Sequence, residues 1–286
     1  RKGVIERTEA RFSSEYELEA GIRRIAQYSG RFLGDNLEID ARLPDGGRVQ
    51  IIRSPAARNG VSVAIRKFFK VKLTIEKLIE GNSLTPEMAD YLSQQVRSHR
   101  NMIIAGGTGT GKTTMLNVLA NFADPAERIL TIEDTAELQL SNPHVVTLES
   151  QKARKSGKGG ITIRELFKAS LRMRPDRIIV GECRGGEAIE LLQAMTSGHD
   201  GTLATLHASG IPETLNRLET MALMGDVDIP MTALKRQIAS AVHVVVQIVR
   251  DHDGPHRGRR RIATVAEIDA ELNAAGDYTY RKVFEH

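Results

Sequence analysis

The sequence predicts an α/β protein with a small N-terminal domain and a larger domain built on a mostly parallel sheet. Before residue 70, alternating apolar and polar residues flank a Pro-Asp-Gly-Gly turn, as in a β-hairpin. From Asn101 onward, short apolar runs alternate with longer amphipathic stretches, which is typical of βαβ units. A Gly-rich segment also separates an apolar run from a helical stretch. We expect an N-terminal α/β domain over 1–72, a linker over 73–84 and a second domain over 85–286.

The N-terminal domain is expected to begin with a helix. Ser14 and Glu17 form a capping box ahead of apolar residues at helical spacing. Strands are expected over 37–43, 49–53 and 60–65, the first two joined by the turn at 44–47. Because the chain starts with Arg1 rather than Met, we expect this domain to be truncated at its start.

The second domain opens with a helix that Thr85 caps, with Pro86 in its first turn. Its alternating pattern then predicts the strands 102–105, 129–132, 145–148, 178–180, 202–206, 242–249 and 261–268. Helices are expected over 112–122, 163–173, 187–196 and 212–224.

The Gly-rich segment, Gly-Gly-Thr-Gly-Thr-Gly-Lys-Thr, matches the phosphate-loop pattern in full. Its glycines let the backbone fold around phosphate with N–H groups pointing inward, and the next helix adds a partial positive charge. We therefore expect ATP and Mg²⁺ here, with Lys112 at the β and γ phosphates and the Thr113 hydroxyl on Mg²⁺. The expected nucleotide-binding residues are Gly106, Gly107, Thr108, Gly109, Thr110, Gly111, Lys112, Thr113 and Thr114.

Three further predicted strands end in polar residues, Glu133, Glu182 and His207. The carboxyl ends of parallel strands share one edge of a sheet, so these side chains should converge near the γ phosphate. Glu182 is the best candidate to orient or deprotonate the attacking water and to hold a metal-bound water. Glu133 could polarise that water or organise the metal shell, and His207 could hydrogen-bond the γ phosphate. The structural alternatives are a helix-start acid, an exposed loop acid and a strand-end histidine, respectively.

The residues beside Glu182, and the cysteine and histidine content, exclude several kinds of enzyme and of metal site. Gly181 stands where an Asp usually ends the second phosphate-site strand, which argues against a simple GTPase or small-molecule kinase. Cys183 has no indicated His or Asn partner, so packing is its expected role. A metal pair of His199 and His207 lacks a third ligand. Because Cys183 is the only cysteine, an internal disulfide and a Cys-type zinc site are excluded and a reducing compartment is expected.

Two basic segments, 152–160 and 257–261, are each either solvated surface or a contact for an acidic partner. We expect the first to be a mobile loop and the second, with Arg250, to lie at a hairpin tip. The arginines of 172–177 could act near phosphate or pair with surface acids.

The composition argues against a membrane span and against binding of single-stranded nucleic acid. The net charge of +4 permits an acidic partner without specifying one, and no apolar run approaches the ~18 residues that a membrane span needs. With no Trp and 4% aromatic residues, the chain is poorly supplied for stacking single-stranded nucleic acid, so no direct nucleic-acid contact is expected.

The motifs together resemble those of the secretion-superfamily (type II/IV secretion) ATPases, most closely the CpaF/TadA ATPases of Tad-type pilus assembly. The resemblance covers nearly the whole chain. It is carried by the phosphate loop, the acidic box 131–137, the segment 171–184 and the histidine box 197–208. The absence of a Cys₄ zinc site agrees with the Tad or type IV secretion branches.

This resemblance implies a PAS-like N-terminal domain followed by a RecA-like P-loop ATPase domain, assembled into a homohexamer. It implies that arginines of the N-terminal domain approach the phosphates, for which Arg66 is the first candidate and Arg48 and Arg53 are weaker ones. It also implies docking onto inner-membrane platform proteins from the cytoplasmic side, where ATP hydrolysis drives pilin assembly or retraction.

Three other functions stay open at this point. A conjugation or type IV secretion ATPase belongs to the same superfamily and would differ in its neighbouring genes. A nucleic-acid-translocating motor shares the RecA-like core, and salt-dependent binding of single strands would identify it. A small-molecule kinase would need a lid and an acceptor pocket, for which no sequence signature is visible.

Overall fold

The protein divides into two compact units, Arg1–Val71 and Lys72–His286, and each is described by itself. The structure is a computed structural model, and the residues that it describes are 6–29, 34, 36–67, 73–151, 159–251, 253 and 256–285.

The first unit is one helix on a three-stranded antiparallel sheet of order β1-β2-β3. Ser14 caps the helix by accepting a hydrogen bond from the Glu17 N–H, as its sequence predicts. The helix packs Ile22 against the apolar face of the first two strands, and its Ala26 is also buried. The elements are α1 (Glu15–Tyr28), β1 (Glu38–Arg42), β2 (Arg48–Ile52) and β3 (Ser62–Arg66).

The helix does not cover the third strand of this sheet. Val63 and Ile65 of β3 pair with Ile51 and Val49 of β2, so these four side chains lie on the same face of the sheet. Val49 and Ile51 are buried, whereas Val63 and Ile65 are 36% and 51% exposed. The first unit therefore presents apolar side chains on its edge strand.

The second unit is built on an eight-stranded sheet of order β11-β10-β9-β4-β8-β7-β5-β6. The six strands from β9 to β6 in this order run parallel, and β10 and β11 add an antiparallel edge. The strands are β4 (Met102–Gly106), β5 (Ile129–Glu133), β6 (Val145–Glu149), β7 (Arg177–Val180), β8 (Leu203–Leu206), β9 (Val244–Arg250), β10 (Arg260–Ile268) and β11 (Tyr280–Glu285).

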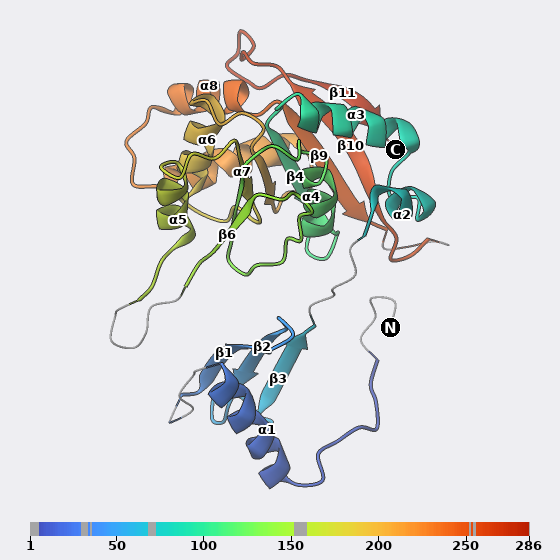
Figure 1. Ribbon diagram of the computed structural model, residues 1–286, viewed down its shortest axis with the longest axis vertical. Coiled ribbons are helices and arrows are strands. Elements are labelled where there is room, and N and C mark those ends of the chain that lie inside the picture. The colour runs from blue at the N-terminus through green and yellow to red at the C-terminus, as the bar shows by residue number, and fades with distance from the viewer. Residues whose placement is uncertain are drawn as a thin grey trace. The chain divides into compact units, whose positions relative to one another are not determined.

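Helices cover both faces of this sheet (Figure 1). Side chains alternate along a strand, so Ile103 of β4 packs under one helical layer and Ile104 under the other. One layer contains α2 (Ile75–Glu80), α3 (Pro86–Arg97) and α4 (Lys112–Ala120). The opposite layer contains α5 (Ile163–Ser170), α6 (Ala188–Thr196), α7 (Ile211–Leu223) and α8 (Met231–Ala241).

The α/β fold is therefore as predicted, except in the linker and in two elements. The predicted linker 73–84 contains α2 and contributes the buried Leu78 and Leu84 to the core. The helix α8 and the strand β11 had no prediction; β11 is a short edge strand in which half of the six residues are charged. The basic segment 152–158 lies outside the described residues. None of the helices in the described part of the chain combines the length and apolar character that crossing a bilayer requires.

Candidate functional site

The Gly-rich segment forms a loop between β4 and α4, at the carboxyl edge of the sheet. Every residue of β4 is buried, which anchors the start of the loop. Gly109 and Gly111 have φ of +72° and +97°, in the left-handed region that favours glycine. Lys112 is the first residue of α4 and Thr113 follows it, so both lie at the positive end of the helix dipole. This conformation suits a bound anion.

Three of the predicted residues, from separate elements, meet beside this loop. The Lys112 ammonium donates to the Gly107 carbonyl oxygen at 2.9 Å and lies 3.4 Å from both ring nitrogens of His207. The His207 Nε2 in turn lies 2.7 Å from the Glu182 Oε1. Arg184 donates to the other oxygen of Glu182 at 2.5 Å. Of the expected set Glu133, Glu182 and His207, the structure thus brings Glu182 and His207 together beside Lys112. Glu133 is bonded elsewhere, to backbone N–H groups of Glu137 and Leu138.

The charges in this group are coupled. Burial alone would raise the pKa of Glu182, but the hydrogen bond and charge of Arg184, with His207 and Lys112, hold it below its ordinary value. Burial and the nearby ammonium lower the pKa of His207, so its imidazole is neutral at pH 7. Burial also lowers the pKa of Lys112. At neutral pH the carboxylate of Glu182 is therefore ionised and the imidazole of His207 is neutral. Lys112 and Arg184 are the two cations beside them.

Glu133 lies at the carboxyl end of β5, 2% exposed. Its Oε1 accepts hydrogen bonds from the backbone N–H groups of Glu137 and Leu138 at 2.9 and 3.1 Å. Among the described residues, its buried Oε2 has no hydrogen-bond partner. Burial raises the pKa of Glu133 to about 7. The alternative of an exposed loop acid is therefore wrong, and an unpaired acceptor oxygen remains at this edge.

The other candidates from the sequence are Cys183 and the pair of His199 and His207. Cys183 is buried, and burial raises the pKa of its thiol, which fits a packing role. His199 precedes β8 and His207 follows it, so the strand separates them. In the described ranges, no three His, Cys, Asp or Glu side chains are grouped closely enough to hold a metal.

The arginine candidates of the first unit lie on its sheet or just after it. Arg53 donates to the Gly34 carbonyl at 3.0 Å and lies 3.4 Å from the Glu19 carboxylate. Arg66 is exposed at the end of β3, opposite Arg48 of β2. A role of Arg66 or Arg48 at the phosphates stays a prediction.

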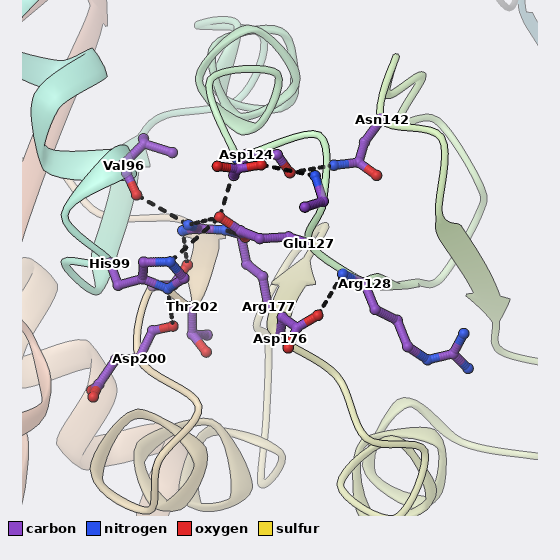
Figure 2. A network of polar contacts seen from close by, with 12 residues as sticks. Val96, His99, Asp124, Glu127, Arg128, Asn142, Asp176, Arg177, Asp200 and Thr202 are labelled. Atoms are coloured by element: carbon purple, nitrogen blue, oxygen red, sulfur yellow. Dashed lines mark hydrogen bonds and ion pairs between the residues drawn. The ribbon is translucent and has the colours of Figure 1, made fainter.

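Arg177 lies at the amino end of β7, on the edge opposite the phosphate loop. Figure 2 shows the polar contacts around it. It is fully buried and donates to both oxygens of Glu127, at 2.6 and 3.0 Å. It also donates to the carbonyl oxygens of Val96 and Gly201. Arg177 is thus a buried structural cation that joins α3, the turn before β5 and the turn before β8. For this arginine, both expectations from the sequence, a phosphate contact and a surface ion pair, are therefore wrong.

One residue at the loop, Arg260, is not among those predicted from the sequence. This first residue of β10 donates from Nε to the Gly109 carbonyl oxygen at 2.8 Å. It also lines a pocket of about 230 Å³ together with Thr110, Gly111 and Thr114. Its basic segment was visible in the sequence, but only the pairing of β9 with β4 brings that segment to the loop.

The chain is similar to known proteins over most of its length. The family described as "Type II/IV secretion system protein" matches residues 5–276. A Mycobacterium tuberculosis (strain CDC 1551 / Oshkosh) protein named "Putative conjugal transfer protein" is 35% identical over 92% of this chain and 75% of that protein. The crystal structure of the VirB11 ATPase from the Brucella suis type IV secretion system, in complex with sulphate, is 31% identical with a TM-score of 0.55, covering 88% of this chain and 80% of that one. The structure of the Legionella pneumophila ATPase DotB shares the fold, at 21% identity and a TM-score of 0.66 over 94% and 73% of the two chains.

Proposed function

The chain belongs to the type II/IV secretion system protein family and is an ATPase, and we propose that it is the ATP-driven motor of a type IV secretion or conjugation machine. The observation that supports this most is the meeting of Lys112, Glu182 and His207 beside the phosphate loop. The relatives named for conjugal transfer and type IV secretion favour this machine over the Tad branch that the sequence motifs most resemble.

In this proposal each residue at the sheet edge has one task. The loop N–H groups and Lys112 bind the β and γ phosphates. Glu182, kept ionised by Arg184, orients and deprotonates the attacking water. The neutral His207 hydrogen-bonds the γ phosphate, and Glu133 polarises the water from the adjoining strand.

The residues present also fit Mg²⁺. The Thr113 hydroxyl follows Lys112 on α4, and Glu182 and the unpaired Oε2 of Glu133 supply the oxygen donors that this ion prefers, directly or through water. When bound, Mg²⁺ would neutralise charge on the phosphates.

The proposed assembly is a homohexamer on the cytoplasmic side of the inner membrane, docked on platform proteins. Apolar side chains exposed on the second unit, Leu223, Met224, Val227 and Met231, and on β3 of the first unit, are surfaces that a second copy would cover. Sedimentation velocity tests the ring: a chain that stays monomeric at all concentrations and with ATP would contradict it.

Tad-type pilus assembly is the second candidate, carried by the acidic and histidine boxes of the sequence. Expression of the Lys112→Ala variant in place of the native chain distinguishes the two candidate functions. Loss of DNA or protein transfer between cells supports the conjugation or secretion motor, whereas loss of surface pili with intact transfer supports the Tad motor.

The ATPase site itself is tested with the purified Lys112→Ala variant and an exposed control, Lys77→Ala. Removing the ammonium from the β and γ phosphates should abolish hydrolysis and weaken ATP binding, measured by phosphate release and isothermal titration with ATP and Mg²⁺. The control should behave like the parent. Parental affinity and turnover in Lys112→Ala would exclude this loop as the site.

A further inference from the structure

The hairpin formed by β9 and β10 reaches the phosphate loop because of the strand order. β9 is the parallel neighbour of β4, with Ile248 opposite Gly106. Both strands therefore end at the same edge of the sheet, β4 in the phosphate loop and β9 in the turn that leads to β10. Arg260, the first residue of β10, stands at this turn.

The Arg260 side chain spans both left-handed glycines of the loop. Its Nε donates to the Gly109 carbonyl oxygen at 2.8 Å. A Cβ built on Gly111 would stand 3.3 Å from the Arg260 Cδ, so the arginine stem lies against the glycine that begins α4. One side chain thus contacts the two glycines of the loop that have a left-handed conformation.

Arg260 has a different partner from the two arginines beside it in the chain. Arg259 and Arg261 both pair with Asp251, at 3.0 and 3.1 Å. Within the described ranges, the only hydrogen-bond partner of the Arg260 side chain is the loop carbonyl, and no carboxylate pairs with it. Its positive charge therefore remains at the edge of the pocket that Thr110 and Thr114 also line.

We propose that Arg260 is a positioning residue for ATP, a role that rests on the proposed ATPase site. It holds the loop in its phosphate-binding shape through the Gly109 carbonyl. A cation on this oxygen also polarises the Gly109–Thr110 peptide, which makes the Thr110 N–H a stronger donor to phosphate. Because Arg260 acts on a binding loop, it stabilises ground state and transition state alike, and it sets affinity rather than turnover.

The experiment compares Arg260→Met, Arg260→Lys and a matched control, Arg257→Met. Methionine keeps the stem over Gly111 and loses the charge, and Arg257 lies in the same turn outside the pocket lining. For Arg260→Met we expect the Kd for ATP with Mg²⁺ and the KM to rise about tenfold, with kcat changed less than about threefold. Arg260→Lys should recover part of the affinity, and Arg257→Met should stay within about twofold of the parent. Amide hydrogen exchange of residues 107–111, without nucleotide, should become faster in Arg260→Met only.

Several results would overturn the role of Arg260. Parental Kd and parental exchange in Arg260→Met would show that it does not hold the loop. A fall in kcat at unchanged Kd would assign it to the chemical step instead. Equal weakening by Arg257→Met would reduce the effect to general charge. If the parent chain bound no ATP, the proposed ATPase site would fail, while the exchange measurement would still decide whether Arg260 holds the loop.

Discussion

The side chain of Glu133 passes directly over the α-carbon of Gly181. A Cβ built on Gly181 would stand 2.9 Å from the Glu133 Cγ and 3.4 Å from its Oε1. The two residues lie at the ends of the neighbouring strands β5 and β7. Glycine at the position where an aspartate usually ends this strand therefore leaves space for a buried glutamate from the next strand.

Gly181→Ala is expected to push the Glu133 side chain from its position. The backbone of Gly181 is not left-handed, so the effect is steric, and overpacking of this kind costs about 1–3 kcal/mol. A double-mutant cycle with Glu133→Ala, followed by urea denaturation, isolates the contact. The same cost in both backgrounds would show that Glu133 is not what the new methyl group meets.

Glu133 makes the stability of the protein depend on pH. Its folded pKa of about 7 lies above the ordinary value of 4.5, so its carboxylate form is destabilised in the fold. The stability that it contributes is complete below about pH 4.5 and is lost as pH rises through 7. Relative to Glu133→Gln, the parent should lose about 3 kcal/mol of unfolding free energy between pH 4.5 and 8. A pH-independent difference would contradict the raised pKa.

Glu182→Gln is expected to keep ATP bound and to slow hydrolysis by about 10²-fold or more, since the amide keeps the shape and loses the basicity. Single-turnover phosphate release and isothermal titration measure the two effects separately. Glu133→Gln should slow hydrolysis less if it only polarises the water. Turnover at the parental rate in Glu182→Gln would remove Glu182 from the chemistry.

Glu127→Gln is expected to destabilise the second unit strongly, because it leaves the fully buried Arg177 without its counter-charge. Removing one partner of a buried pair costs about 3–5 kcal/mol. Exposed Glu80→Gln is the control and should change the urea midpoint little. A small effect of Glu127→Gln would mean that the carbonyl groups of Val96 and Gly201 alone satisfy the arginine.

Arg66→Ala is expected to leave folding, ring assembly and measurable ATP binding intact and to lower turnover by at least about tenfold. The reason is that an arginine at the phosphates stabilises charge on the departing γ phosphate. Turnover of the parent should also rise steeply with protein concentration as rings form. Full activity in a dilute monomer, together with parental turnover in Arg66→Ala, would refute both.

The phosphate loop and the strands that lead to Glu133, Glu182 and His207 could be predicted from the sequence, because each carries a local pattern and parallel strands share an edge. The structure adds what depends on neighbours in space. Arg177 is buried because Glu127, 50 positions earlier, meets it, and sequence alone treats an arginine as a surface residue. Arg260 reaches the loop only through the pairing of β9 with β4. The depth of Glu133, and hence its pKa, depends on the absence of a side chain at Gly181.

The strand order also has a consequence for biosynthesis. Both hydrogen-bonded neighbours of β4 come late in the chain, since Met102 pairs with Leu203 and with Val244. A ribosome adds roughly 5–20 residues per second. The strand β4 is therefore synthesised on the order of ten seconds before β9, its second neighbour. During that time its apolar edge is open to chaperones. A nascent chain that stops before β9 also lacks Arg260, so a truncated message cannot yield a subunit with the complete loop surroundings described here.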